Sequence, residues 1–272
     1  MTMIQPKVTI LVPNYQTLEL TKLCLRLIRK YTDMQKVRVV VIDNDSHDLS
    51  LHYLRRVSWI QLIERKIIPN EGAISAHSRA LDLGLEHVTT PYVLSLHTDS
   101  LVKHPQWLEF LIAQMEKNPN IAGVGSWKLE SKPWWRGVLK TLERNAQLAY
   151  YRIIGQSQHG IEGIGKNYYY LRSHCAMYRL DLLNKLNLRF SSGDRVAGKE
   201  MHKQLIDAGY EMVFLPSEVL IHYLEHINHA TTVLNPELST RPKSVDKGLR
   251  RIEKSLARLH ATSVLLDESL DH

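Results

Sequence analysis

The stretch Val39–Ser46, Val-Val-Val-Ile-Asp-Asn-Asp-Ser, decides the fold class of this chain. Its four branched apolar residues are typical of a strand buried on both faces, and they end abruptly in carboxylates and small polar residues. The same pattern returns at Tyr92–Ser100, where an apolar run ends in His97, Thr98 and Asp99. Ligands of open α/β sheets bind at the carboxyl ends of strands. The two strand ends therefore predict a site for a cation and a polar, phosphorylated ligand.

Short apolar runs alternate with amphipathic segments up to residue 125. Strands separated by single helices imply right-handed βαβ units and a parallel sheet. The predicted strands are 8–12, 37–42, 60–63, 92–96 and 121–125, and the predicted helices are 18–30, 47–56, 72–86 and 106–117.

The pattern loosens over residues 128–167, as in binding loops or lids, and then becomes regular again. A strand at 168–178, a helix at 199–208 and a strand at 212–215 are expected. After Pro242 the sequence predicts a basic amphipathic helix, with lysines and arginines opposite a leucine and isoleucine stripe.

Composition indicates an ordinary globular protein of 272 residues, 44% of them hydrophobic and 23% charged. No run approaches the ~20 apolar residues needed to cross a bilayer, and the first residues lack the apolar core of a signal peptide. Cys24 and Cys175 lie far apart, which favours reduced thiols and a cytoplasmic location. The net charge of +7 favours anionic partners.

Several motifs in a fixed order carry a resemblance to a known family. The chain resembles an inverting glycosyltransferase of family 2 with the GT-A fold, of a rhamnosyltransferase-like subgroup, from Val8 to His222. The resemblance implies an α/β fold with a Rossmann-like, mostly parallel central sheet flanked by helices, and a C-terminal helical extension. The motifs are Val12–Tyr15, Val41–Ser46 with Asp48, Asn70–Gly72 with Ala76, Leu96–Asp99 with Pro105 and Trp107, and Ala208–Tyr210 with Pro216 and His222.

The resemblance also implies an organisation and an activity. Residues 1–127 would form the nucleotide-sugar-binding half of the GT-A domain, 128–235 its acceptor-binding half, and 236–272 the basic C-terminal helix. The activity would move a sugar from a nucleoside diphosphate sugar to an acceptor hydroxyl, in the synthesis of cell-surface polysaccharide, lipopolysaccharide or another glycoconjugate. The leaving diphosphate is strongly anionic, so Mg2+ or Mn2+ is the expected cofactor.

The family's metal motif, Asp-x-Asp or a degenerate form, reads His97-Thr98-Asp99 here. Because the first acid is absent, the resemblance implies Asp99 as a metal ligand and leaves His97 to face the ribose or a sugar hydroxyl. His222 falls where family members often place a histidine that reaches the metal or the diphosphate. Two alternatives stay open: Asp99 would cap the following helix, or His222 and His226, spaced i, i+4 on a helix, would chelate zinc.

The nucleotide itself is expected at the ends of the first strands. Asp43 matches the family's acid that bonds to the base or ribose, Tyr15 offers its ring near the base, and Gly72 lets the backbone approach the ligand. The implied nucleotide-binding residues are Pro13, Asn14, Tyr15, Asp43, Asn44, Ser46, Asn70, Gly72 and His97.

The general base is harder to assign. The family usually has a Glu-Asp pair about ten residues before Ala-Gly-Tyr, but this chain reads Ala197-Gly198-Lys199-Glu200. The resemblance therefore implies Glu200 as the catalytic base, with Asp194 as a substitute if the loop is shifted. The missing pair also keeps open a catalytically inactive sugar-nucleotide-binding protein. A nucleotidyltransferase would need a glycine-rich basic loop after the first strand, which Pro13–Gln16 does not supply.

The expected partners are a nucleoside diphosphate sugar and a glycan or lipid-linked glycan acceptor. The acceptor should dock on residues 128–178, where Arg172 and His174 add polarity. Trp134–Arg136 with the residues that follow, and the basic C-terminal helix, resemble interfacial helices, which predicts visits to an anionic membrane surface at the inner face of the plasma membrane. Packing of both helices on the core, or a homodimer contact, is the alternative. No nucleic acid partner is expected.

Overall fold

The computed structural model describes residues 5–129, 143, 145–147, 150–151, 163–193, 196–227, 230–235 and 245–272. Its centre is a seven-stranded sheet in the order β3-β2-β1-β4-β7-β6-β8. Strand β7 runs antiparallel to both of its neighbours, and the other strand pairs of this sheet are parallel, so the mostly parallel sheet is confirmed. The strands are β1 (Val8–Asn14), β2 (Val37–Asn44), β3 (Gln61–Arg65), β4 (Tyr92–Leu96), β6 (Ile121–Gly125), β7 (Cys175–Arg179) and β8 (Glu211–Phe214).

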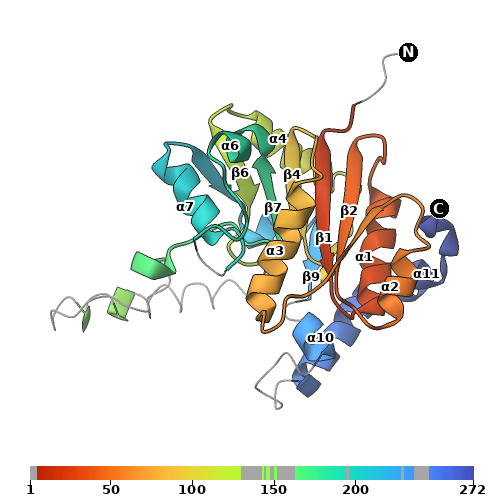
Figure 1. The fold of residues 1–272 in the computed structure, drawn as a ribbon. Coiled ribbons are helices and arrows are strands. Elements are labelled where there is room, and N and C mark those ends of the chain that lie inside the picture. Colours follow the sequence, from red (N-terminus) through yellow and green to blue (C-terminus); the bar gives the residue numbers. More distant parts are fainter. Residues whose placement is uncertain are drawn as a thin grey trace.

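Two helical layers bury the two faces of the sheet (Figure 1). Side chains of β2 alternate between them: Val39 and Val41 pack in the cluster with α1, whereas Val40 and Ile42 pack in the cluster with α3. This two-sided burial explains why the strand is a continuous apolar run. The first layer holds α1 (Leu18–Tyr31), α2 (Leu49–Leu54) and α4 (Trp107–Glu116), and the second holds α3 (Ala73–Leu85), α6 (Leu180–Lys185) and α7 (Lys199–Asp207).

A small second sheet joins two parts of the chain that are distant in sequence. Strand β5 (Ser100–Val102) pairs antiparallel with β9 (Leu224–His226), which follows the short helix α8 (Ser217–Leu220), and Ser100 is the register partner of His226. The sequence pattern did not predict this pair, because each strand has only three residues. The pairing brings His226 next to Asp99.

The strand predicted at 168–178 is much shorter than expected. A 3-10 turn, η1 (Gly165–Asn167), precedes this segment, and regular strand structure starts only at Cys175. The backbone N–H of Leu171 donates to Nδ1 of His202, and that of Arg172 donates to the Ser126 carbonyl. These bonds hold residues 168–174 out of the ladder and turn them toward the ends of the strands.

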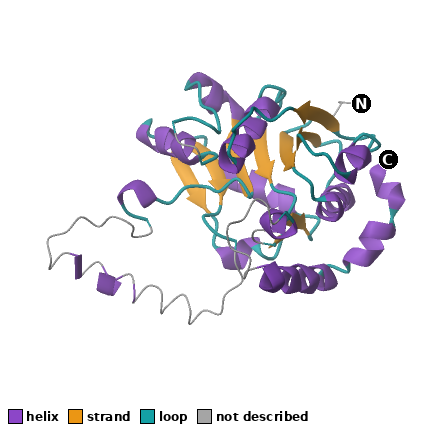
Figure 2. Ribbon diagram, turned by 60° about the horizontal axis from the view of Figure 1, so that its bottom comes forward, coloured by secondary structure: helices purple, strands orange, loops and turns teal. Residues whose placement is uncertain are grey.

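The predicted helix after Pro242 is present as α10 (Val245–Arg258) and lies against α9 (Ala230–Leu234). Its buried side carries Gly248, Ile252 and Ser255, so this side packs on protein. At His260 the backbone takes a left-handed conformation (φ 49°), and the chain continues into α11 (Ala261–Leu266) and the turn η4 (Glu268–Asp271). Figure 2 shows these helices along one side of the molecule.

Close approach of β6 to β7 leaves Gly125 no room for a side chain. A Cβ at Gly125 would lie 2.8 Å from the Cys175 carbonyl oxygen and 3.1 Å from the Ala176 Cα, both of them backbone atoms. We expect Gly125→Ala to lower the free energy of unfolding by about 1–3 kcal/mol, because the two strands must separate. Urea denaturation measures this change. Gly72→Ala is the matched control, since nothing lies within 4 Å of its Cβ position. Equal losses for both variants would contradict the packing argument.

Candidate active site

A cavity of about 500 Å³ opens where β1, β2 and β4 end. Other lining residues come from α3, from the segment before β7, from the segment before α7 and from the segment that includes β9 and α9. The cavity therefore lies at the carboxyl edge of the sheet, as the strand ends predicted. The described lining residues are Pro13, Asn14, Tyr15, Asn44, Ile67, Glu71, Ala73, Ala76, His77, His97, Thr98, Asp99, Tyr170, Arg172, Ser173, His174, Val196, Ala197, His226, Thr231 and Thr232.

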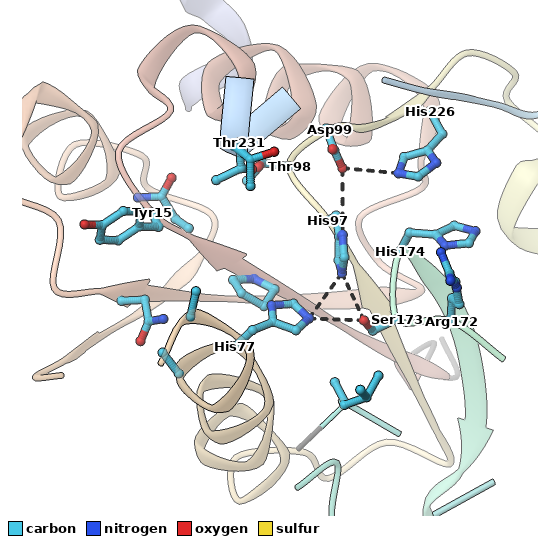
Figure 3. A pocket seen from close by; sticks show the side chains of 18 of the residues that line it. Tyr15, His77, His97, Thr98, Asp99, Arg172, Ser173, His174, His226 and Thr231 are labelled. Atoms are coloured by element: carbon cyan, nitrogen blue, oxygen red, sulfur yellow. Dashed lines mark hydrogen bonds and ion pairs between the residues drawn. The ribbon is translucent and has the colours of Figure 1, made fainter. Parts of the chain in front are cut away.

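Two histidines and one aspartate converge in this cavity (Figure 3). Oδ1 of Asp99 lies 3.5 Å from Nε2 of His226 and 3.8 Å from Nδ1 of His97. One ligand atom from each residue lies within 4.8 Å of the others. Asp99 and His97 stand at the end of β4, and the β5–β9 pairing supplies His226. This trio is a ready ligand set for a divalent cation.

Asp99 has the properties expected of a metal ligand. Its side chain is buried, and among the described residues Oδ1 has no hydrogen-bond partner, while Oδ2 accepts from the N–H of Ala230. Burial by itself raises the pKa of Asp99, but the interactions with His226 and His97 outweigh it and lower the pKa to about 2. Burial lowers the pKa of His97 to about 4. A carboxylate and the neutral imidazole of His97 suit a divalent cation at neutral pH.

His77 and Ser173 hold His97 on the side away from Asp99. Nε2 of His97 lies 3.2 Å from Nε2 of His77 and 3.0 Å from Oγ of Ser173, which is itself 3.1 Å from Nε2 of His77. Because Nε2 of His97 is engaged with these two groups, its Nδ1 is left to face Asp99. Partners of this kind orient metal-bound histidines. Burial is the main cause that lowers the pKa of His77 to about 3.

His174 completes the cluster from the other side. Its Nε2 lies 2.9 Å from Oγ of Ser126, and its ring stacks on that of His226 with centroids 4.7 Å apart. Burial lowers the pKa of His174 well below its usual value. The stacked, neutral ring fixes the orientation of His226.

The predicted nucleotide-binding residues fall into two groups. Pro13, Asn14, Tyr15, Asn44 and His97 line the cavity, and His97 belongs to the ligand set as well. Asp43, Ser46, Asn70 and Gly72 are absent from the described lining.

Asp43 shapes the loop instead of facing the cavity. It is buried, its Oδ1 accepts from Nδ2 of Asn14 at 2.7 Å, and its Oδ2 accepts from the N–H of Ser46 at 2.9 Å. Oγ of Ser46 accepts in turn from Asn14 and from the N–H of Gln16. The pair therefore holds the ends of β1 and β2 in place.

Glu71, between Asn70 and Gly72, is the residue of this loop that lines the cavity. Both of its carboxylate oxygens accept from Nη2 of Arg65 at 2.7 Å, and its side chain is 2% exposed. Nη1 of Arg65 donates to Oδ1 of Asn44 at 2.6 Å. The buried pair thus fixes the Asn44 amide with its oxygen toward Arg65. The sequence pattern did not reveal this network, since its members come from three separate elements.

His222 is not in the cluster. It is exposed in the turn after α8 and does not line the cavity, so the geometry puts His226 where the sequence predicted His222. His226 belongs to a strand, which also removes the zinc alternative that required both histidines on one helix. Asp99 precedes β5, and α4 begins only at Trp107, so Asp99 does not cap the helix that follows it in the sequence.

Only one of the two candidate bases, Glu200, is among the described residues, and it does not line the cavity. Glu200 lies in the first turn of α7, close to Gly193, and is absent from the lining, although Val196 and Ala197 are part of it. Asp194 lies outside the described residues.

Replacing His226 and His222 by alanine, one at a time, tests which of the two histidines binds the cation. We expect His226→Ala to weaken Mn2+ binding by at least about tenfold, because one of three ligands is lost. The matched variant His222→Ala should change it less than about twofold. Electron paramagnetic resonance of free Mn2+ measures both affinities without any sugar donor. The opposite order would restore His222 as the ligand.

The family model described as glycosyl transferase family 2 matches residues 9–186. The chain belongs to glycosyl transferase family 2. The described cavity residues from Pro13 to His174 lie within the matched residues, whereas His226 lies beyond them.

Comparison with individual proteins agrees with this assignment. An uncharacterized glycosyltransferase of Haemophilus influenzae is 31% identical over 94 residues, which are 34% of this chain and 28% of that protein. The mannosyltransferase PcManGT from Pyrobaculum calidifontis, solved with GDP-Man and Mn2+, has a TM-score of 0.57 at 19% identity and covers 96% of this chain and 70% of its own. Staphylococcus aureus TarS 1-349 has a TM-score of 0.53 at 15% identity, over 97% and 76% of the two chains. These likenesses show the GT-A fold.

Proposed function

We propose that this family member transfers a sugar from a nucleoside diphosphate sugar to an acceptor hydroxyl with inversion, assisted by a divalent cation. The observation that carries the proposal is the trio His97, Asp99 and His226 in a cavity at the strand ends of a family 2 chain. The similar fold of PcManGT was solved with GDP-Man and Mn2+, which supports both the donor class and the cation.

Different residues along the cavity would bind different parts of the donor. Tyr15 and Asn44 would bind the base, with Arg65 and Glu71 holding Asn44 in orientation. His97, Asp99 and His226 would hold the cation, which supplies positive charge against the leaving diphosphate. Two imidazole ligands favour Mn2+ over Mg2+, because Mg2+ prefers oxygen ligands.

For the general base we consider the two acids that the sequence predicted, Glu200 and Asp194. Glu71 and Asp99 already serve Arg65 and the cation site, and Glu200 does not line the cavity. We therefore expect Asp194→Asn to lower kcat by about 100-fold or more, and Glu200→Gln to lower it by less than about threefold. Steady-state kinetics with saturating donor measures both. A collapse of kcat in Glu200→Gln alone would return the role to Glu200.

Thermal unfolding with UDP, GDP, dTDP and CMP sugars, with and without Mn2+, tests the proposal. A donor at ~100 times its Kd adds about 2.7 kcal/mol of stability. We expect one nucleotide to raise the midpoint, and only when Mn2+ is present. A shift that is indifferent to Mn2+ would refute the cation site, and no shift with any donor would refute the function.

Measuring turnover distinguishes the proposed enzyme from a catalytically inactive sugar-nucleotide-binding protein. A protein that only binds sugar nucleotides would show the same thermal shift but would never release nucleoside diphosphate. Because His97, Asp99 and His226 could together hold a cation, we expect release. Including a rhamnose donor in the panel tests the rhamnosyltransferase-like subgroup.

The acceptor side rests on the sequence expectations. We propose that residues 1–127 bind the donor and 128–235 the acceptor, a glycan or lipid-linked glycan, at the cytoplasmic membrane surface. No helix of the described ranges is long and apolar enough to span a bilayer. The interfacial helix expected after Trp134 lies outside the described residues. Co-sedimentation with anionic liposomes at low salt tests the membrane contact, and analytical ultracentrifugation tests the homodimer.

A further inference from the structure

Arg172 is the one lysine or arginine among the described residues that line the cavity. Its guanidinium lies over the ring of Trp127, with Cζ 4.5 Å from the ring centroid, and its backbone N–H donates to the Ser126 carbonyl. Both contacts come from the residues that follow β6, so this part of the chain holds Arg172 in place. In Figure 3 Arg172 and Tyr15 lie on opposite sides of His97.

The positive charge of Arg172 has no counter-ion in the described part of the chain. No carboxylate there forms an ion pair with it, and its Nε is buried without a hydrogen-bond partner. The two acids of the lining are engaged elsewhere: Glu71 pairs with Arg65 and Arg79, and Asp99 faces His97 and His226. A guanidinium stacked on an aromatic ring, with unused donors, is an arrangement that recognises phosphate or carboxylate.

Apart from Asp99, the described titratable neighbours of Arg172 in the cavity add no negative charge. His97 and His174, the titratable neighbours whose pKa the charge of Arg172 helps to lower, are neutral imidazoles. Lys128 also lies on the Trp127 ring, with Nζ 5.7 Å from the centroid. Arg172 therefore puts the one lysine or arginine charge of the described lining at the end away from Tyr15.

We propose that Arg172 binds an anionic group of the acceptor, a phosphate or a carboxylate, so that the acceptor is an acidic or phosphorylated glycan. This inference rests on the proposed function. With the base near Tyr15 and the diphosphate at Asp99, the donor occupies the cavity up to the cation site. Arg172 lies beyond His97 from the base, in the half proposed to take the acceptor, and its donors remain for the second substrate.

Sulfate tests the site directly, because it is a tetrahedral dianion that does not precipitate Mn2+. The full chain is saturated with Mn2+ and the nucleoside diphosphate selected by the thermal panel, which fills the donor site, and sulfate is then titrated by calorimetry. We expect Arg172→Gln to weaken sulfate binding at least about tenfold. Arg38→Gln, an exposed arginine remote from the cavity lining, removes the same charge and should leave sulfate binding unchanged.

The possible results of this experiment distinguish failure of the acceptor assignment from failure of the proposed function. Equal sulfate affinity in wild type and Arg172→Gln, or no sulfate binding to wild type, would overturn the proposal. If Arg172→Gln instead weakens the Mn2+–nucleoside diphosphate about tenfold, Arg172 serves the donor and the acceptor assignment is overturned. If no nucleoside diphosphate binds to wild type, the proposed function fails and the acceptor assignment falls with it. A sulfate titration without nucleotide then still shows whether Arg172 is an anion site.

Discussion

Asp99→Asn should lower sugar transfer by about 1,000-fold, equivalent to ~4 kcal/mol of transition-state stabilisation. Asp99 is the only carboxylate of the described trio, and its Oδ1 lies within 3.8 Å of both imidazoles. An amide keeps the shape and the contact with Ala230 but loses the charge that attracts the cation. The measurement is kcat/KM together with the Mn2+ affinity of the donor-free protein.

The control for Asp99→Asn is Asp33→Asn, which removes the same charge from the surface ion pair with Lys36. Kinetics and Mn2+ affinity of this control should match wild type. Circular dichroism establishes that both variants are folded. If Asp99→Asn keeps wild-type affinity for Mn2+, the trio is not the cation site.

Asp271→Asn should lower the free energy of unfolding at pH 7 by about 3 kcal/mol, the range for breaking a buried ion pair. Arg26 of α1 is 3% exposed, and its Nε donates to Oδ1 of Asp271 at 2.9 Å. The Tyr53 hydroxyl donates to the same oxygen, and Trp59 Nε1 donates to the Leu270 carbonyl. Without the carboxylate, a buried guanidinium loses its charge partner. Urea denaturation measures the loss.

The effect of Asp271→Asn should depend on pH. Burial raises the pKa of Asp271, but the hydrogen bond and charge of Arg26 and the Tyr53 hydroxyl outweigh it, so the pKa is lowered. A lowered carboxyl pKa contributes its full stability above the unfolded value of about 3.9 and loses it as the pH falls through the folded value. The difference between wild type and variant should therefore be complete at pH 6–7 and shrink in acid.

A surface ion pair gives the comparison for Asp271→Asn. Glu116 pairs with Lys7, and both side chains are about half exposed. Glu116→Gln should cost less than about 1 kcal/mol at any pH, because water screens the pair. A similar small cost for Asp271→Asn, without pH dependence, would show that α11 and η4 dock by their apolar contacts alone.

Much of the molecule follows from local patterns. The apolar run of β2 predicts a strand buried on both faces, since Val39 and Val40 must enter opposite layers. The strand-end position of Asp99, and of Pro13, Asn14 and Tyr15, predicts a polar site at the carboxyl edge of a parallel sheet. These features depend on the alternation of side chains and on the chain direction, which residues close together in the sequence determine.

Local patterns could not predict which distant side chains contact those residues. Sequence favoured His222, but the β5–β9 pairing places His226 beside Asp99 and leaves His222 exposed. His77, from α3, became a neighbour of His97 only through the packing of that helix on the sheet. Arg26 meets Asp271 across 245 positions of sequence. Which distant side chains meet is set by strand order and by how the helices pack, because those long-range contacts form only when the whole core is buried.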